Sequence, residues 1–291
     1  MFFEGSAVAL VTPFDKNGNV NYYSLKDLIE FQIANGTKAI VILGTTGESS
    51  TITKEERTKI IKFVVCLVNK RIPVIIGTGS NNTKTAICQT QEAESLGADG
   101  ALVVTPYYNK CNQNGLYLHY KMVAESVKLP IILYNVPSRT GVNILPETAK
   151  RLSKIKNIVG IKEASGNLYQ ISKLINILPK TFNVYSGDDS LNLPLYLLGA
   201  KGTISVTANC YPDKVALMYN YASTGDYHNA KRINSLLAKV NEALFFDVNP
   251  ICVKEYLNYQ GFCVGDTRLP LSKPTKSICK KLKGVFDYYE N

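Results

Sequence analysis

The sequence alternates short apolar runs with longer amphipathic segments, and this alternation constrains the fold more than any other feature. The runs are rich in valine and isoleucine and lack the polar alternation of a half-exposed antiparallel strand. Such runs are typical of parallel strands that are buried on both faces. Eight of them predict strands, at residues 7–11, 39–43, 73–76, 101–104, 131–134, 158–162, 182–186 and 203–206.

The segments between the runs carry the signals of helix ends. Thr53 and Glu56 have the spacing of a capping box, at the start of a segment over residues 54–69 whose isoleucine and valine side chains fall on one face. Glycine is the usual residue in a left-handed helix cap. Three glycines stand where a helix should end before the next strand: Gly36, Gly97 and Gly199.

Strand followed by helix, eight times over, predicts an α/β fold of the (β/α)8 TIM barrel type. An open doubly wound sheet is the alternative, but its first turn usually reads G-x-G-x-x-G, whereas here it reads TPFDKNGN. Beyond Gly225 the strand signal ceases and helical periodicity continues, in residues 227–246, 250–259 and 273–287. We therefore expect a barrel over residues 1–225 and a C-terminal helical appendage over residues 226–291.

Composition narrows the function classes. Hydrophobic residues make up 45% of the chain, which excludes a disordered or fibrous protein. The net charge of +10 favours anionic ligands, but the basic residues are scattered, so we expect no nucleic-acid partner. No apolar stretch approaches the ~18 residues of a membrane span, and the N-terminus lacks the basic region of a signal peptide, so we expect no membrane association.

Cysteine and histidine usage bears on compartment and metals. Seven cysteines without a C-x-x-C pair, in a chain that is large enough to fold without disulfides, indicate reduced thiols and a cytoplasmic protein. His119 and His228 have no second histidine or cysteine at ligand spacing, so we expect no zinc site.

The reacting residues of a TIM barrel lie at the carboxyl ends of its strands and in the loops that follow. This rule selects five segments: GTTGES at 44–49, TPYYN at 105–109, YNVPSRTG at 134–141, KEASG at 162–166 and SGDD at 186–189.

Lys162 closes the sixth run and places a long cation at the mouth of an apolar barrel. Desolvation disfavours the ammonium form there and frees the amine as a nucleophile for Schiff-base chemistry on a carbonyl substrate. The alternative is a lysine that reaches solvent or pairs with Glu163. Tyr134 ends the adjacent run and, together with Thr45 and Tyr108, forms a candidate proton relay, although each of these side chains has an ordinary packing role as its alternative.

Two further features concern the substrate. Gly44 and Gly47 bracket two threonines and would let backbone amides approach a carboxylate, unless the segment is simply a tight turn. Asp188 and Asp189 follow the seventh run, where many barrels bind phosphate, so a non-phosphorylated substrate is favoured. With Glu48 these acids would instead hold Mg²⁺ in a different class of enzyme, although an Asp pair also suits a helix N-terminus.

These motifs, together with GIKEASGN at 160–167 and NPICVK at 249–254, resemble the dihydrodipicolinate synthase family over essentially the whole chain. The wider superfamily of pyruvate-dependent class I aldolases shares the GTTGE-like turn and the lysine. The resemblance implies an enzyme that condenses pyruvate with L-aspartate 4-semialdehyde to 4-hydroxy-tetrahydrodipicolinate, in diaminopimelate and lysine biosynthesis, without a metal or other cofactor.

The resemblance also implies roles for single residues. Lys162 forms the imine with pyruvate, and Thr46 binds the pyruvate carboxylate. Tyr134, Thr45 and Tyr108 form the relay, with Tyr108 reaching in from the partner subunit of a tight dimer, and two such dimers make a homotetramer.

Arg139 would bind the carboxylate of the semialdehyde, a role that suits a permanently charged fork. Gly187 and Ile204 match positions whose backbone carbonyls lie near the lysine. N-acetylneuraminate lyases and 2-keto-3-deoxygluconate aldolases generally lack this arginine, so the sequence favours the synthase and leaves these aldolases as the alternative. The non-enzymatic alternative is a barrel that only binds polyanions through its positive charge.

One departure from the family bears on regulation. Members that lysine inhibits carry histidine at the positions matching Lys54 and Arg57, and glutamate at the position matching Thr85. The other residues of that pocket are retained: Ser49, Asn81 and Tyr107. Two added cations and a missing carboxylate disfavour a bound ammonium group, which predicts weak or absent feedback inhibition.

Overall fold

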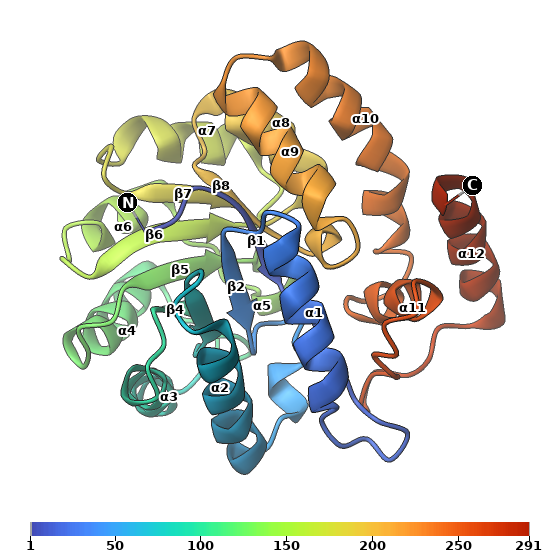
Figure 1. Cartoon of the computed structure of the whole chain (residues 1–291). Coiled ribbons are helices and arrows are strands. Elements are labelled where there is room, and N and C mark those ends of the chain that lie inside the picture. Colours follow the sequence, from blue (N-terminus) through green and yellow to red (C-terminus); the bar gives the residue numbers. More distant parts are fainter. Residues whose placement is uncertain (1, 291) are drawn as a thin grey trace.

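The computed structural model describes residues 2–290, whose eight parallel strands close into a barrel in the order β1 to β8 (Figure 1). The strands are β1 Gly5–Ala9, β2 Ala39–Ile42, β3 Val74–Gly77, β4 Gly100–Val104, β5 Ile131–Asn135, β6 Ile158–Glu163, β7 Asn183–Ser186 and β8 Gly202–Ser205. Each predicted strand is confirmed, with ends that shift by one or two residues. The (β/α)8 prediction is therefore correct.

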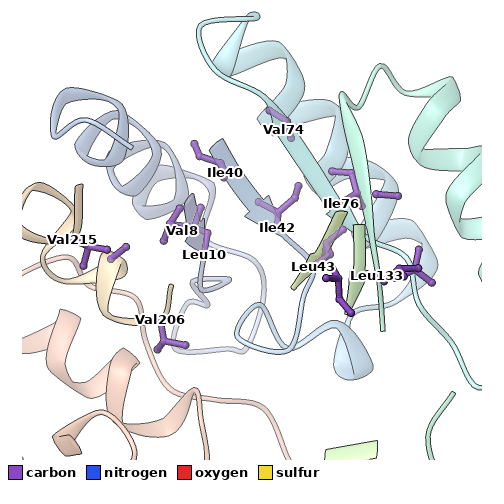
Figure 2. Packing of buried hydrophobic residues seen from close by; sticks show 14 of the residues in the cluster. Val8, Leu10, Ile40, Ile42, Leu43, Val74, Ile76, Leu133, Val206 and Val215 are labelled. Carbon is purple, nitrogen blue, oxygen red and sulfur yellow. The ribbon is translucent and has the colours of Figure 1, made fainter. Parts of the chain in front are cut away.

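Alternate residues of each strand serve two separate apolar layers, because successive side chains point to opposite faces. In β1, Ala7 belongs to a small cluster inside the barrel, whereas Val8 belongs to the large cluster between strands and helices. Figure 2 shows the outer set, in which Ile40, Ile42 and Val74 project from neighbouring strands. Burying such a side chain contributes about 1.5–3 kcal/mol relative to exposure, so the continuous apolar runs stabilise both layers.

Helices surround the barrel on the outside (Figure 1). They are α1 Tyr22–Ala34, α2 Lys54–Val68, α3 Thr83–Ser95, α4 Gln113–Glu125, α6 Pro146–Leu152, α7 Leu168–Ile177, α8 Asn192–Leu198 and α9 Pro212–Ser223. The capping box at the start of α2 is confirmed, since Thr53 Oγ1 accepts from the Glu56 amide and the Glu56 carboxylate accepts from the Thr53 amide. The three glycines expected at helix ends all have left-handed backbones: Gly36, Gly97 and Gly199.

Short helices occupy the loops at the carboxyl ends of the strands. The one-turn helix α5 Pro137–Thr140 follows β5, and 3₁₀ helices follow β2, β7 and β8, at Ser49–Thr51, Asp189–Leu191 and Thr207–Asn209. These loops carry the segments that the sequence analysis selected. Among residues 2–290 no helix is both long and apolar enough to cross a membrane.

Three helices follow the barrel: α10 Tyr227–Ala243, α11 Ile251–Tyr259 and α12 Lys276–Glu290. In Figure 1, α10 runs alongside α9, and α11 and α12 lie together on one side of the barrel. The residues just before α11 reach the cavity at the barrel mouth, where they contact loops from the first half of the chain.

Candidate active site

Lys162 lies on β6 inside the barrel. It pairs in register with Tyr134 on β5 and with Tyr185 on β7, and both tyrosines belong to the interior cluster. Only 4% of Lys162 is exposed, and its Nζ atom lies 4.5 Å from the centroid of the Tyr134 ring. The predicted approach of these two side chains is thus confirmed, and it follows from adjacent strand positions.

The ordinary alternatives for Lys162 do not hold. Glu163 points to the opposite face of β6, where its carboxylate accepts from Asn135 Nδ2 at 3.1 Å and from the Ser165 amide at 2.9 Å. Burial raises the pKa of Glu163. Lys162 therefore neither reaches bulk solvent nor pairs with its neighbour, and its amine is placed within the barrel.

Gly187 lies directly against the lysine side chain. A Cβ atom at Gly187 would lie 2.8 Å from Lys162 Cε and 2.9 Å from Ala164 Cβ, so glycine leaves the space that the lysine side chain fills. Ile204 is fully buried on β8 in the interior cluster.

A cavity of about 1240 Å³ lies at the carboxyl ends of the strands. Three predicted site residues, Thr45, Tyr134 and Arg139, are in its wall. Residues that precede α11, Val248 and Asn249, also line it. The cavity thus adjoins the lysine through Tyr134 and brings groups from both ends of the sequence together.

Thr46 and Arg139 are joined through one residue that the sequence analysis did not select. Thr46 is 2% exposed, and its Oγ1 accepts from Asn249 Nδ2 at 3.0 Å. Arg139 Nη2 donates to the backbone carbonyl of Asn249 at 3.1 Å. The motif NPICVK contains Asn249, so a signal was present, but nothing local in the sequence places it beside Thr46.

Tyr108 stands apart from the other relay candidates within one chain. It is 89% exposed, has a φ of 69°, and is not in the cavity wall, whereas the neighbouring Tyr107 is. The structure brings Thr45 and Tyr134 to one cavity but leaves Tyr108 outside it.

The acids proposed as a magnesium site are bonded elsewhere. The Asp189 carboxylate accepts from Ser205 Oγ and from the amides of Val206 and Thr207. Glu48 pairs with Lys254 at 2.9 Å. Asp188 Oδ1 accepts from the Ser190 amide, and no group of three or more His, Cys, Asp or Glu side chains that could hold a metal ion occurs within residues 2–290.

The far end of the cavity lies between α2 and α3. Arg57 is buried there and binds Glu92, with its Nε 3.1 Å from Glu92 Oε2. Burial lowers the pKa of Arg57, while the nearby Glu92 opposes that shift. Lys54 and Thr85 line the same part. A carboxylate is therefore present in this pocket, although not at the position that the family pattern suggested.

The barrel holds an amine against a tyrosine, beside a cavity that contains an arginine. This arrangement defines the barrel lyases that form an imine with their substrate, which are the class I aldolases. The dihydrodipicolinate synthetase family model matches residues 2–287, and the chain belongs to this family.

Individual relatives agree over the full length. A protein of Geotalea uraniireducens (strain Rf4) named 4-hydroxy-tetrahydrodipicolinate synthase is 52% identical over 287 residues, which cover 99% of each chain. The crystal structure of dihydrodipicolinate synthase from Aquifex aeolicus matches with a TM-score of 0.97 at 47% identity, covering 99% of this chain and 98% of that one. The chloride-inhibited dihydrodipicolinate synthase of Acinetobacter baumannii, complexed with pyruvate, also matches with a TM-score of 0.97 at 47% identity, covering 99% of each chain.

Proposed function

We propose that the chain condenses pyruvate with L-aspartate 4-semialdehyde to form 4-hydroxy-tetrahydrodipicolinate, a step of diaminopimelate and lysine biosynthesis. The observation that carries this proposal is the Lys162 amine, held inside the barrel with its Nζ 4.5 Å from the Tyr134 ring centroid. Full-length relatives with the synthase name support the same reaction.

The proposed chemistry begins at Lys162. Its amine attacks the keto carbon of pyruvate, and loss of water gives an imine. Removal of a methyl proton then gives an enamine, whose carbon attacks the aldehyde of the second substrate. The amino group of that substrate closes the ring by displacing Lys162, which restores the free amine. Tyr134, Thr45 and Tyr108 carry the protons between these steps.

Substrate recognition is assigned to the groups around the lysine. Thr46 binds the pyruvate carboxylate and Arg139 binds the semialdehyde carboxylate, in a charge-assisted hydrogen bond that a guanidinium fork suits. The backbone carbonyls of Gly187 and Ile204 lie near the bound keto acid. Arg139 in the cavity wall supports this assignment over a sugar-acid aldolase, whose substrate is polyhydroxylated.

The proposal extends to assembly and compartment. We assign a homotetramer of two tight dimers, in which the exposed Tyr108 enters the site of its partner. We assign the cytoplasm as the compartment, in keeping with cysteines that are free thiols, among them the exposed Cys66, Cys88 and Cys263. Small-molecule substrates are the ligands, with neither nucleic acid nor membrane as partner.

Borohydride trapping tests the reaction class. Reduction in the presence of pyruvate should attach the keto acid covalently to Lys162, as peptide mass spectrometry would show. Lys162→Ala should lose the adduct, while the control variant Lys280→Ala, changed at a distant lysine, should keep it. An adduct that survives in Lys162→Ala would contradict the proposal.

Arg139→Ala tests the substrate. Loss of a charged hydrogen bond should lower kcat/KM for the semialdehyde by about ten- to a hundredfold. Pyruvate trapping should persist in this variant. Unchanged turnover of the semialdehyde, or faster turnover of sugar aldehydes by the wild type, would favour the aldolase alternative.

A further inference from the structure

Asn249 contacts both groups that we assign to substrate carboxylates. Its Nδ2 donates to Thr46 Oγ1 at 3.0 Å, and its backbone carbonyl accepts from Arg139 Nη2 at 3.1 Å. It lies in the cavity wall and is 5% exposed. One residue that precedes α11 therefore holds the loop after β2 and the helix after β5 at the same time.

The bond from Asn249 sets the direction of the Thr46 hydroxyl. A hydroxyl group has one proton to donate and two lone pairs that accept. Because Nδ2 is a donor, it occupies a lone pair of Oγ1, and the hydroxyl proton must point elsewhere. Within residues 2–290 this is the only hydrogen bond of Thr46 Oγ1, so none of these residues accepts its hydroxyl proton.

The other end of the Asn249 amide has no structural use. Its Oδ1 atom is buried and has no hydrogen-bond partner among residues 2–290. An unsatisfied buried amide oxygen is destabilising, and native structures keep few of them. An asparagine that served only packing would not leave this oxygen unpaired. The hydrogen bond from Asn249 Nδ2 to Thr46 Oγ1 is therefore what explains an asparagine at this position.

We propose that Asn249 is a positioning residue. Its amide directs the Thr46 hydroxyl proton toward the carboxylate of the keto acid, while its backbone carbonyl holds Arg139 ready for the carboxylate of the second substrate. This inference rests on the proposed function, and it assigns the relative placement of the two carboxylate sites to a residue that touches neither substrate.

Steady-state kinetics of Asn249→Ala test the inference, because this variant removes the amide and keeps the backbone carbonyl. The KM for pyruvate should rise about tenfold, the value of one hydrogen bond, while the KM for the semialdehyde should change less than about twofold. Trapping at Lys162 should still reach completion at saturating pyruvate. Equal changes in both KM values, or an unchanged KM for pyruvate, would overturn the inference.

Asn249→Asp is the second variant, since it keeps the shape of the side chain and so protects against a folding failure. A carboxylate accepts the Thr46 proton and repels the keto-acid carboxylate, so the KM for pyruvate should rise further than in Asn249→Ala. A smaller rise than in the alanine variant would count against the proposed direction of the hydroxyl proton.

A double-mutant cycle asks whether Asn249 acts through Thr46. Thr46→Val removes the hydroxyl, so adding Asn249→Ala should leave the pyruvate KM within about twofold of that of Thr46→Val alone. Additive effects would overturn the inference. Absence of pyruvate trapping in the wild type would instead overturn the proposed function, which keeps the two failures distinct.

Discussion

Lys162 fills space that a side chain at Gly187 would take away, since a Cβ atom there would lie 2.8 Å from Lys162 Cε. Gly187→Ala should therefore displace the amine. A shift of about 1 Å at a reacting group lowers turnover about a hundredfold, so we expect a loss of that order in kcat and in the rate of pyruvate trapping. Overpacking should also lower the free energy of unfolding by about 1–3 kcal/mol.

The matched control for this glycine is Gly284→Ala on α12, where an added Cβ meets nothing within 4 Å. Its turnover should equal that of the wild type. If Gly187→Ala trapped pyruvate at the wild-type rate, the position of the Lys162 amine would not depend on this space.

His119 is a buried titratable residue away from the lysine. Burial lowers its pKa to about 4 from 6.5, and its Nε2 atom has no partner among residues 2–290. As pH falls below 6.5, the unfolded chain therefore protonates this imidazole. The folded chain does not protonate it until about pH 4. The free energy of unfolding should fall by about 2 kcal/mol between pH 7 and pH 5 on this account.

Urea unfolding of wild type and His119→Gln at both pH values would measure this contribution. The glutamine variant has no imidazole to protonate, so its loss of stability between pH 7 and pH 5 should be about 2 kcal/mol smaller. Equal losses in the two proteins would mean that other groups cause the acid sensitivity.

At the scale of elements, a buried ion pair joins α11 to the loop after β2. Lys254 Nζ lies 2.9 Å from Glu48 Oε1 and also donates to the Asp266 carbonyl at 2.8 Å. Burial lowers the pKa of Lys254, and Glu48 opposes that shift. Removing one partner of such a pair strands the other charge, so Lys254→Met should lower the free energy of unfolding by about 3–5 kcal/mol.

An exposed ion pair supplies the control for this prediction. Lys173 and Glu147 lie at the surface, so Lys173→Met should change the free energy of unfolding by less than about 1 kcal/mol. Adding Glu48→Gln to Lys254→Met should recover part of the loss. Similar small losses for the two lysine variants would show that Glu48 does not need its buried partner.

The pocket between α2 and α3 determines the expected response to L-lysine. Glu92 is the carboxylate of this pocket, but its oxygens already accept from Arg57 and Thr58. Lys54 and Lys84 line the pocket as well and repel an ammonium group. We therefore expect that submillimolar L-lysine does not reach half-inhibition in a turnover assay. Thr85→Glu should lower the L-lysine concentration that gives half-inhibition. Submillimolar inhibition of the wild type would contradict this.

The fold was predictable from the sequence at the level of elements, because strands buried on both faces leave continuous apolar runs. The ends of the strands were harder to predict. Two strands, β1 and β8, begin at Gly5 and Gly202, and glycine gives no apolar signal. The last helix begins at Lys276, after the expected start at residue 273, since a residue before proline, here Lys273, is unfavourable in a helix.

The site was predictable where strand register alone places its residues, as for Lys162 and Tyr134, which lie side by side on adjacent strands. Contacts between distant segments carry no such local signal. Asn249 and Thr46 are 203 positions apart, and nothing in either motif indicates that they meet. The pairing of Arg57 with Glu92 was missed for the same reason, because it depends on how two helices pack.

Within residues 2–290 the C-terminal helices contact the barrel, since α10 packs on α9. We propose that residues 226–291 act as an appendage that closes one side of the barrel mouth. Arg268 supports this view, because its guanidinium donates to the carbonyls of Gly18 and Thr51 and to the Glu56 carboxylate. Through these contacts the C-terminal region holds the loops on which the cavity depends.

The proposed assembly is testable at this scale, because within one chain Tyr108 lies outside the cavity. If the tyrosine enters the site of a partner, Tyr108→Phe and Lys162→Ala chains should complement each other when they are co-expressed with different tags. In a mixed dimer the Tyr108→Phe chain keeps its lysine and receives an intact tyrosine, while the other site lacks both. Random pairing makes half of the dimers mixed, so about a quarter of wild-type sites should be active.

Specific activity of the purified mixture, corrected for that of each variant alone, measures this fraction, and sedimentation of the wild type gives the number of subunits. The mixed dimers alone, isolated by both tags, should reach about half of wild-type activity because one site of two is intact. Activity equal to the mean of the two parent variants would show that Tyr108 does not act across an interface, because only a residue shared between subunits can be restored by a partner that is itself inactive.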